Sequence, residues 1–362
     1  MQYDWYKKEL EAKLRELKRL VKTASGEQRE VINETISTIE DNLVKPCRLV
    51  NYTLEERLLY EYQNMIEFRP LWDLCESLAD LSDNEILNLP YPKLDLKNKE
   101  VLELTHDFFK NVTPSWIYDL FMKIFKQRTN LHFINYNKSL FYADTVFLKY
   151  YNTCYIQMAR KYEFSDIPTL AHEFGHGIQF LSNYHANIFT NLKAFSEIVS
   201  SFFEFICGYY YAQDSTLGPK AIVNNYVTWD IACYDASSLV KEIQILKSIE
   251  VSSYETKLDL YRNIKKFIAL SDKNNLRDLL DNKPSADFIY IFAYTIVTQL
   301  VMIYIKDPDY AFYLLKKLME IDLRLTQEQY LDELLDIGLL PTESVEEYNH
   351  HVKRELTRLK KL

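Results

Sequence analysis

The sequence predicts a mainly α-helical protein, and three observations support this fold class. Six glycines and ten prolines are few for a chain of 362 residues, whereas leucine, lysine and glutamate are frequent. Apolar residues recur at helical spacing along most of the chain. Only residues 131–159 differ, because aromatic and β-branched residues interrupted by polar turns predict a small antiparallel β-sheet there.

The N-terminal helices are expected at residues 3–23 and 27–44. Ala24-Ser25-Gly26 separates them, and the first carries an apolar stripe of leucines at helical spacing. We expect a helical hairpin that packs on the rest of the protein. A coiled-coil site for a partner is the alternative, although the stripe is short for that purpose.

The remaining helices follow from capping residues and periodicity. Thr53-Leu-Glu-Glu56 has the pattern of a capping box, and Pro114 suits the first turn of another helix. Residues 82–98 contain Pro90 and Pro92 and lack periodicity, so we expect a boundary there. The expected helices are 53–68, 71–81, 99–110, 114–126, 166–180, 194–212, 219–250, 254–270, 286–306, 308–321, 328–336 and 343–361.

Composition narrows the classes of partner. A net charge of −9 and a pI near 5.4 argue against nucleic acid or an anionic membrane. The five cysteines are scattered, which predicts reduced structural thiols rather than a disulfide framework. No basic-then-apolar leader and no apolar run of membrane-spanning length are expected. Together these features predict a cytoplasmic protein.

The sequence His172-Glu173-Phe-Gly-His176 is the strongest chemical signal in the chain. On a helix, the two histidines lie one turn apart on the same face, so both can reach one metal ion. Glu173 lies on the neighbouring flank and could act as a base on a water molecule at that ion. This residue pattern is typical of zinc hydrolases.

A chance pattern with two surface histidines is the alternative. The surrounding residues are apolar, however, and buried histidines need polar or metal partners. The predicted helix also accepts Gly175 and Gly177, at a cost of roughly 1 kcal/mol each. We therefore expect another element to approach the helix closely at these glycines.

A catalytic zinc ion needs a third protein ligand. A scheme with a third histidine fails, because Gln179 and Ser182 stand where its glycine and histidine should be. Glu197 is favoured instead, since it lies 21 residues after His176 in an apolar segment. A buried glutamate satisfied by a lysine or by Ser200 is the alternative. Glu204, two turns further on, is expected to support a ligand histidine.

These motifs resemble the thimet oligopeptidase and oligoendopeptidase F family of zinc peptidases, with a similarity that covers roughly residue 88 to the end. The matching segments are Asp166–His176, Phe195–Glu204, Asn137-Lys138-Ser139, Phe288–Tyr294 and Leu335–Gly338. The resemblance implies a zincin-type helical domain around a channel or cleft, with short peptides as substrates. It also implies one Zn²⁺ per chain held by His172, His176 and Glu197, with Glu173 as general base.

The resemblance further implies that a tyrosine of the aromatic stretch stabilises the oxyanion. Tyr290 and Tyr294 share one helix face, and the sequence favours Tyr294 without excluding Tyr290. The chain departs from the family pattern at Gln179, at Leu140 and at Phe292, and it is shorter than typical members. The carboxypeptidase Taq family shares His-Glu-Phe-Gly-His, but its His-Glu-Ser-Gln-Ser-Arg motif is missing here.

The sequence thus predicts an N-terminal helical region at 1–82 and a zinc peptidase domain at 83–362 that hydrolyses short peptides. The alternative is a peptide-binding protein that has kept the zinc site but has weak or no activity. Glu173 favours the enzyme, because a purely structural zinc site needs no base.

Overall fold

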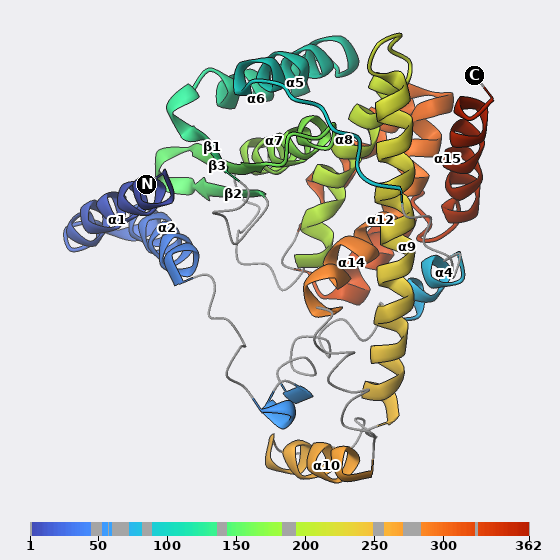
Figure 1. Ribbon diagram of the computed structural model, residues 1–362. Helices are drawn as coiled ribbons and strands as arrows, with labels where there is room; N and C mark the ends of the chain where they lie inside the picture. The colour runs from blue at the N-terminus through green and yellow to red at the C-terminus, as the bar shows by residue number, and fades with distance from the viewer. Residues whose placement is uncertain are drawn as a thin grey trace.

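The computed structural model describes residues 2–44, 53–56, 58–59, 72–81, 89–135, 143–182, 193–248, 257–270, 284–322 and 325–361. Helices dominate it, which confirms the mainly α-helical class (Figure 1). They are α1 (Gln2–Leu20), α2 (Gly26–Val44), α4 (Glu76–Ala79), α5 (Asn98–Val112), α6 (Ser115–Phe125), α7 (Asp166–Ser182), α8 (Lys193–Ala212), α9 (Gly218–Ser248), α10 (Lys257–Leu270), α12 (Pro284–Lys306), α13 (Pro308–Glu320), α14 (Gln327–Asp336) and α15 (Val345–Leu359).

Most predicted helix boundaries that fall on described residues lie within a few residues of the observed ones, whereas the end of the helix predicted at 53–68 lies outside the described residues. The Thr53 capping box is present, with Glu56 N 3.2 Å from Thr53 Oγ1 and Thr53 N 2.8 Å from Glu56 Oε2. The helix predicted at 71–81 is shorter in the structure, where a 3₁₀ turn at 72–75 precedes α4. The loop predicted at 182–192 lies almost entirely outside the described residues, as do Asn137-Lys138-Ser139 and Leu140.

The small sheet is mixed, so the prediction of an antiparallel sheet is wrong in part. Its strands are β1 (Leu131–Asn135), β2 (Ala143–Leu148) and β3 (Thr153–Arg160), in the order β1-β3-β2. A tight turn with Asn152 in the left-handed region (φ 46°) makes β2 and β3 antiparallel, whereas β1 pairs in parallel with the other edge of β3. Side-chain alternation indicates which faces are buried, but it does not indicate the order of the strands.

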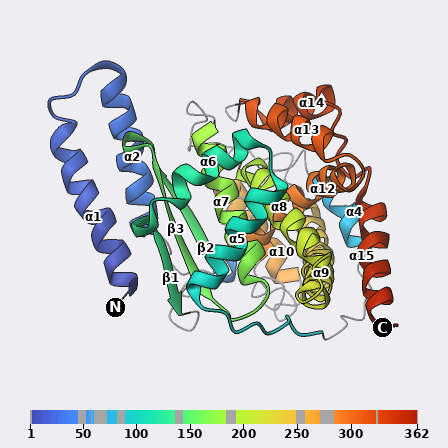
Figure 2. The same cartoon turned by 90° about the horizontal axis from the view of Figure 1, so that it is seen from above.

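The two faces of the sheet pack against different helices. Figure 2 shows the sheet between the hairpin α1–α2 and the main body of helices, where α7 contacts β2 and β3. Alternate residues of the strands point to each side. The residues on the hairpin side are Val146, Leu148 and Tyr155, which pack with Leu10, Leu17, Ile32 and Ile39. The leucine stripe of α1 therefore packs within this chain, with Leu14 and Leu20 partly buried beside the two buried leucines, and the expected packing of the hairpin on the body is confirmed.

The main core surrounds α12, which packs against α8, α9, α13 and α15. Within α12, residues Ile289–Lys306 are long and apolar enough to cross a membrane by length and composition alone. The expectation that no apolar run approaches that length is therefore wrong. Sixty-one per cent of this window is buried inside the protein, as in the core helix of a large helical domain.

Candidate active site

The helix that carries the histidine pair lies very close to α8. A Cβ atom added to Gly175 would lie 2.7 Å from the Cα atom of Ser200, and one added to Gly177 would lie 2.6 Å from Ile124 Cδ1. Both distances are shorter than normal contacts. The expected close approach at the two glycines is therefore observed, and at Gly175 it involves the backbone of α8, one turn from Glu197.

A buried ion pair fixes the start of α7. Arg160, the last residue of β3, places its Nε atom 2.9 Å from Asp166 Oδ2, and both side chains are almost fully buried. The Asp166 carboxylate also accepts hydrogen bonds from the main-chain N–H groups of Lys161 and Tyr162. Because a second nitrogen of Arg160 donates to Asn98, the β3–α7 junction is tied to α5 as well. These bonds fix the position of the first turn of α7.

Three side-chain atoms converge between α7 and α8. The Nε2 atoms of His172 and His176 are 3.1 Å apart, and each lies 3.2 Å from Glu197 Oε2. Zinc bonds to nitrogen and oxygen of about 2.0–2.1 Å in tetrahedral geometry place ligand atoms about 3.3 Å apart. The observed triangle therefore fits three ligands of one zinc ion, and these are the three residues that the sequence predicts.

Glu204 contacts the far side of the first histidine. His172 Nδ1 lies 3.0 Å from Glu204 Oε2, so this nitrogen donates its hydrogen to the carboxylate. In the neutral ring, Nε2 then presents a lone pair toward Glu197 Oε2, which is also an acceptor. Two acceptors at 3.2 Å repel each other unless a cation lies between them. The contact between His172 Nε2 and Glu197 Oε2 is therefore favourable only when a proton or a metal ion lies between these atoms.

The pKa values of these groups reflect the same demand for positive charge. Burial would lower the pKa of His172, but hydrogen bonds to Glu197 and Glu204 raise it well above its ordinary value. Burial would likewise raise the pKa of Glu197, yet the charge of His176 and the contacts with both histidines hold it well below the ordinary value. The carboxylates thus stabilise positive charge at the His172 imidazole, and a divalent cation would supply positive charge at the same place.

Glu173 lies beside this triangle in the wall of a cavity, and its side chain is held by a residue that sequence reasoning missed. Thr145 Oγ1 on β2 lies 2.5 Å from Glu173 Oε2 and 3.0 Å from the main-chain oxygen of Glu173. Burial raises the pKa of Glu173, while His172, His176 and the Thr145 hydrogen bond partly offset that rise. Side chains along β2 alternate between the two faces of the sheet, so Thr145 lies on the same face as Phe147, which packs in the main core. This alternation is the one sequence signal that could have indicated Thr145.

Both candidate tyrosines line the same cavity, but they are placed differently. The ring of Tyr290 is 6.1 Å from that of His172, between centroids. Tyr294 is only 9% exposed, and its ring packs 5.0 Å from that of Phe205. The Tyr290 side chain is 39% exposed, and the charge of Glu197 is the main cause that raises its pKa well above the ordinary value. The geometry therefore favours Tyr290, whereas the sequence favours Tyr294.

The cavity is large and acidic. Its volume is about 780 Å³, within the range of ligand sites, and its walls come from α7, α8, α9 and α12. Asp235 of α9 adds to the carboxylates already described, and isoleucines of α9 and α12 form apolar patches. Lys161 is the lysine among the described lining residues, and burial lowers its pKa.

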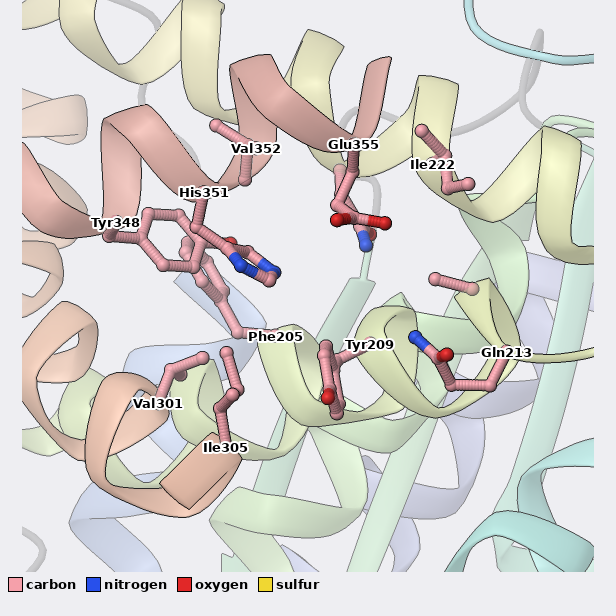
Figure 3. Close-up of a pocket in the computed structure, with 12 residues that line it drawn as sticks. Phe205, Tyr209, Gln213, Ile222, Val301, Ile305, Tyr348, His351, Val352 and Glu355 are labelled. Carbon is pink, nitrogen blue, oxygen red and sulfur yellow. The ribbon is translucent and has the colours of Figure 1, made fainter. Parts of the chain in front are cut away.

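A second pocket lies between α8, α9, α12 and α15 (Figure 3). Its labelled side chains include Phe205, Tyr209, Tyr348 and His351, which point toward a common space. The pocket offers only about 20 Å³, roughly the room that one water molecule needs. It is therefore too small for a substrate. The cavity of about 780 Å³ is the candidate site because His172, Glu173 and Glu197 line it.

Comparisons with known proteins indicate the fold. No protein-family model and no curated protein sequence matches the chain. A Bacillus anthracis str. Ames structure provisionally named oligoendopeptidase F matches with a TM-score of 0.53 and 15% identity, over 92% of this chain and 64% of that chain. A second structure with the same provisional name matches with a TM-score of 0.53 and 14% identity, over 92% and 66%.

A provisionally named peptidase from Chlamydophila abortus matches with a TM-score of 0.54 and 14% identity, over 84% of this chain and 55% of that chain. The chain thus has the mainly helical fold of these structures, in agreement with the resemblance that the sequence motifs indicate. It spans less than two thirds of the length of each.

Proposed function

We propose that the protein is a zinc-dependent peptidase that hydrolyses short peptides, with one zinc ion per chain. The observation that carries this proposal is the triangle of His172, His176 and Glu197, with Glu173 next to it in the wall of a large cavity. A zinc ion held there would polarise the scissile carbonyl group as a Lewis acid. Glu204 would orient His172 through the hydrogen bond at Nδ1.

Glu173 acts as the general base in this proposal. Its carboxylate takes a proton from the attacking water and delivers it to the leaving amine. The burial that raises its pKa makes the carboxylate a stronger base than a glutamate in water. A carboxylate in this place has no function in a merely structural metal site.

A tyrosine hydroxyl supplies the donor for the oxyanion. Negative charge develops on the carbonyl oxygen as water attacks, and a fixed donor stabilises this charge. Tyr290 and Tyr294 both line the cavity, and the ring of Tyr290 lies 6.1 Å from that of His172, between centroids. We assign the role to Tyr290 first and to Tyr294 second.

The sheet offers a surface for the substrate. Among the described strands, β2 pairs only with β3, and Ala143 at its start lines the cavity. An extended peptide can add to such an edge through main-chain hydrogen bonds. A cavity of about 780 Å³ suits a short peptide better than a folded protein.

The alternative function is that of a peptide-binding protein with a retained zinc site. One experiment distinguishes the peptidase from the peptide-binding protein. A mixed pool of short peptides is incubated with the protein, with and without a chelator. If the protein is a peptidase, mass spectrometry should detect new product peptides. These products should be absent when the chelator is present and should form again when Zn²⁺ is added. A chelator that only lowers the melting temperature, with no products in any arm, supports the binding protein.

A further inference from the structure

The hydroxyl group of Thr145, on the edge strand β2, lies within hydrogen-bond distance of two oxygen atoms of Glu173, and its single hydrogen is closest to the carboxylate. The hydroxyl oxygen lies 2.5 Å from the carboxylate oxygen Oε2 and 3.0 Å from the main-chain oxygen of the same residue. In the described part of the chain, Thr145 is the side chain whose hydrogen bond reaches this carboxylate. The contact therefore joins the sheet to α7 at Glu173, the candidate base.

The carboxylate of Glu173 needs such a support because of its long side chain. Three rotatable bonds separate it from the main chain, and no intrinsic preference selects one orientation of the carboxylate. When Oε2 is held against β2, the other oxygen is directed by the planar geometry of the group. A reacting group that is misplaced by about 1 Å can lose on the order of 100-fold in rate.

Thr145 itself is held rigidly. It lies in the middle of β2, opposite Ile156 of β3, and the neighbouring Val146 and Phe147 are buried on opposite faces of the sheet. Its β-branched side chain has a restricted χ1 angle, so the hydroxyl group has few alternative positions. A donor on a packed strand fixes its acceptor better than a donor on a loop.

We infer that Thr145 is a positioning residue, which holds the Glu173 carboxylate in the orientation that the reaction needs. This inference rests on the proposed function, because it assigns Glu173 as the base. Thr145 has no contact with substrate in this account and acts only through Glu173.

Three variants test the inference. Thr145→Val keeps the shape of the side chain and removes the hydroxyl group, whereas Thr145→Ser keeps the hydroxyl group. Thr105→Val is the control, because it also removes a threonine hydroxyl group that donates a hydrogen bond, here to the main-chain oxygen of Val101 at 2.8 Å in α5. Thr105 is fully buried, whereas Thr145 is half-buried, so the control variant is at least as sensitive to a general loss of stability. Each variant is assayed for kcat, KM, zinc content and melting temperature with a peptide that the wild type cleaves.

We expect Thr145→Val to lower kcat about 10- to 100-fold while KM and zinc content stay near the wild-type values. Thr145→Ser should restore most of kcat, and Thr105→Val should leave it unchanged. Wild-type kcat in Thr145→Val would overturn the inference. An equal loss of kcat in Thr105→Val would overturn it too, because the effect would then be one of general stability.

Crystal structures of Thr145→Val and Thr145→Ser provide a readout that is independent of activity. The inference predicts that the Glu173 carboxylate rotates away or becomes disordered in Thr145→Val and keeps its place in Thr145→Ser. An unmoved carboxylate in Thr145→Val contradicts it. If the wild type cleaves no peptide, the proposed function fails, and these structures still decide whether Thr145 positions Glu173.

Discussion

His172 Nδ1 lies 3.0 Å from Glu204 Oε2, while Nε2 of the same ring lies 3.2 Å from Glu197 Oε2. One imidazole thus connects two carboxylates that are two turns apart on α8. The Glu204 contact fixes the ring orientation and the tautomer, and it leaves Nε2 free to act as a ligand. The geometry of the proposed metal site therefore depends on a residue outside the triangle of His172, His176 and Glu197.

Removal of this support should weaken metal binding without abolishing it. We expect Glu204→Ala to lower zinc affinity about 10- to 100-fold, and Glu204→Gln to lower it less, since the amide oxygen can still accept the Nδ1 hydrogen. Competition with a chromophoric chelator measures both affinities. Wild-type affinity in Glu204→Ala would show that the hydrogen bond is irrelevant to the ligand.

Glu197→Ala should have a stronger effect than Glu204→Ala. The substitution removes one corner of the triangle and leaves two histidine ligands, too few for a stable catalytic zinc site. Metal analysis of the purified variant should show little or no zinc. Full occupancy would move the third ligand elsewhere, and Glu204 would be the first residue to examine.

The neighbours of α7 predict different costs at its two glycines. A Cβ atom at Gly175 meets the backbone of Ser200, which cannot move by itself, whereas at Gly177 it meets the end of the flexible Ile124 side chain. Gly175→Ala should destabilise the protein by about 1–3 kcal/mol. Gly177→Ala should cost less, because the gain in helix propensity of roughly 1 kcal/mol offsets a small displacement.

Urea denaturation of the two glycine variants measures the difference in the free energy of unfolding. Equal stability of the variants would mean that α8 does not approach α7 as closely as described. Zinc content in Gly175→Ala should fall as well, because Ser200 and Glu197 belong to the same turn of α8.

The oxyanion donor can be identified by removing one hydroxyl group at a time. Tyr290→Phe should lower kcat by about 10²–10³ with KM and zinc content nearly unchanged, because the lost bond forms mainly in the transition state. Tyr294→Phe serves as the comparison, since its ring also lines the cavity but packs against Phe205. The reverse result would assign the role to Tyr294, and wild-type kcat in both would place the donor elsewhere.

Sequence reasoning succeeds where local spacing determines geometry. The spacing of four positions from His172 to His176 fixes their relation on one helix, and the chain length to Glu197 allows a second helix to return beside the first. The glycines at 175 and 177 indicate a close neighbour, which is observed. Most helix boundaries can be predicted for the same reason, because the spacing of apolar residues along a short segment determines whether a helix has an apolar face.

Sequence reasoning fails where two segments that are distant in the sequence must contact each other. The parallel pairing of β1 with β3 and the bond from Thr145 to Glu173 depend on how strands are ordered and on where α7 lies across them. The Arg160–Asp166 pair is close in sequence, but its burial follows from packing against α5. Tyr290 and Tyr294 share a helix face, so their different neighbours, His172 for Tyr290 and Phe205 for Tyr294, depend on where α12 lies along the other helices.

The substitution Glu173→Gln tests the central claim most directly. It preserves the shape of the side chain and removes only its ability to accept a proton, so zinc content and melting temperature should stay near the wild-type values. General acid–base catalysis contributes on the order of 10²–10⁴ in rate, and kcat for a peptide that the wild type cleaves should fall by at least this factor. A Glu173→Gln variant with full zinc occupancy and wild-type kcat would contradict the proposed mechanism.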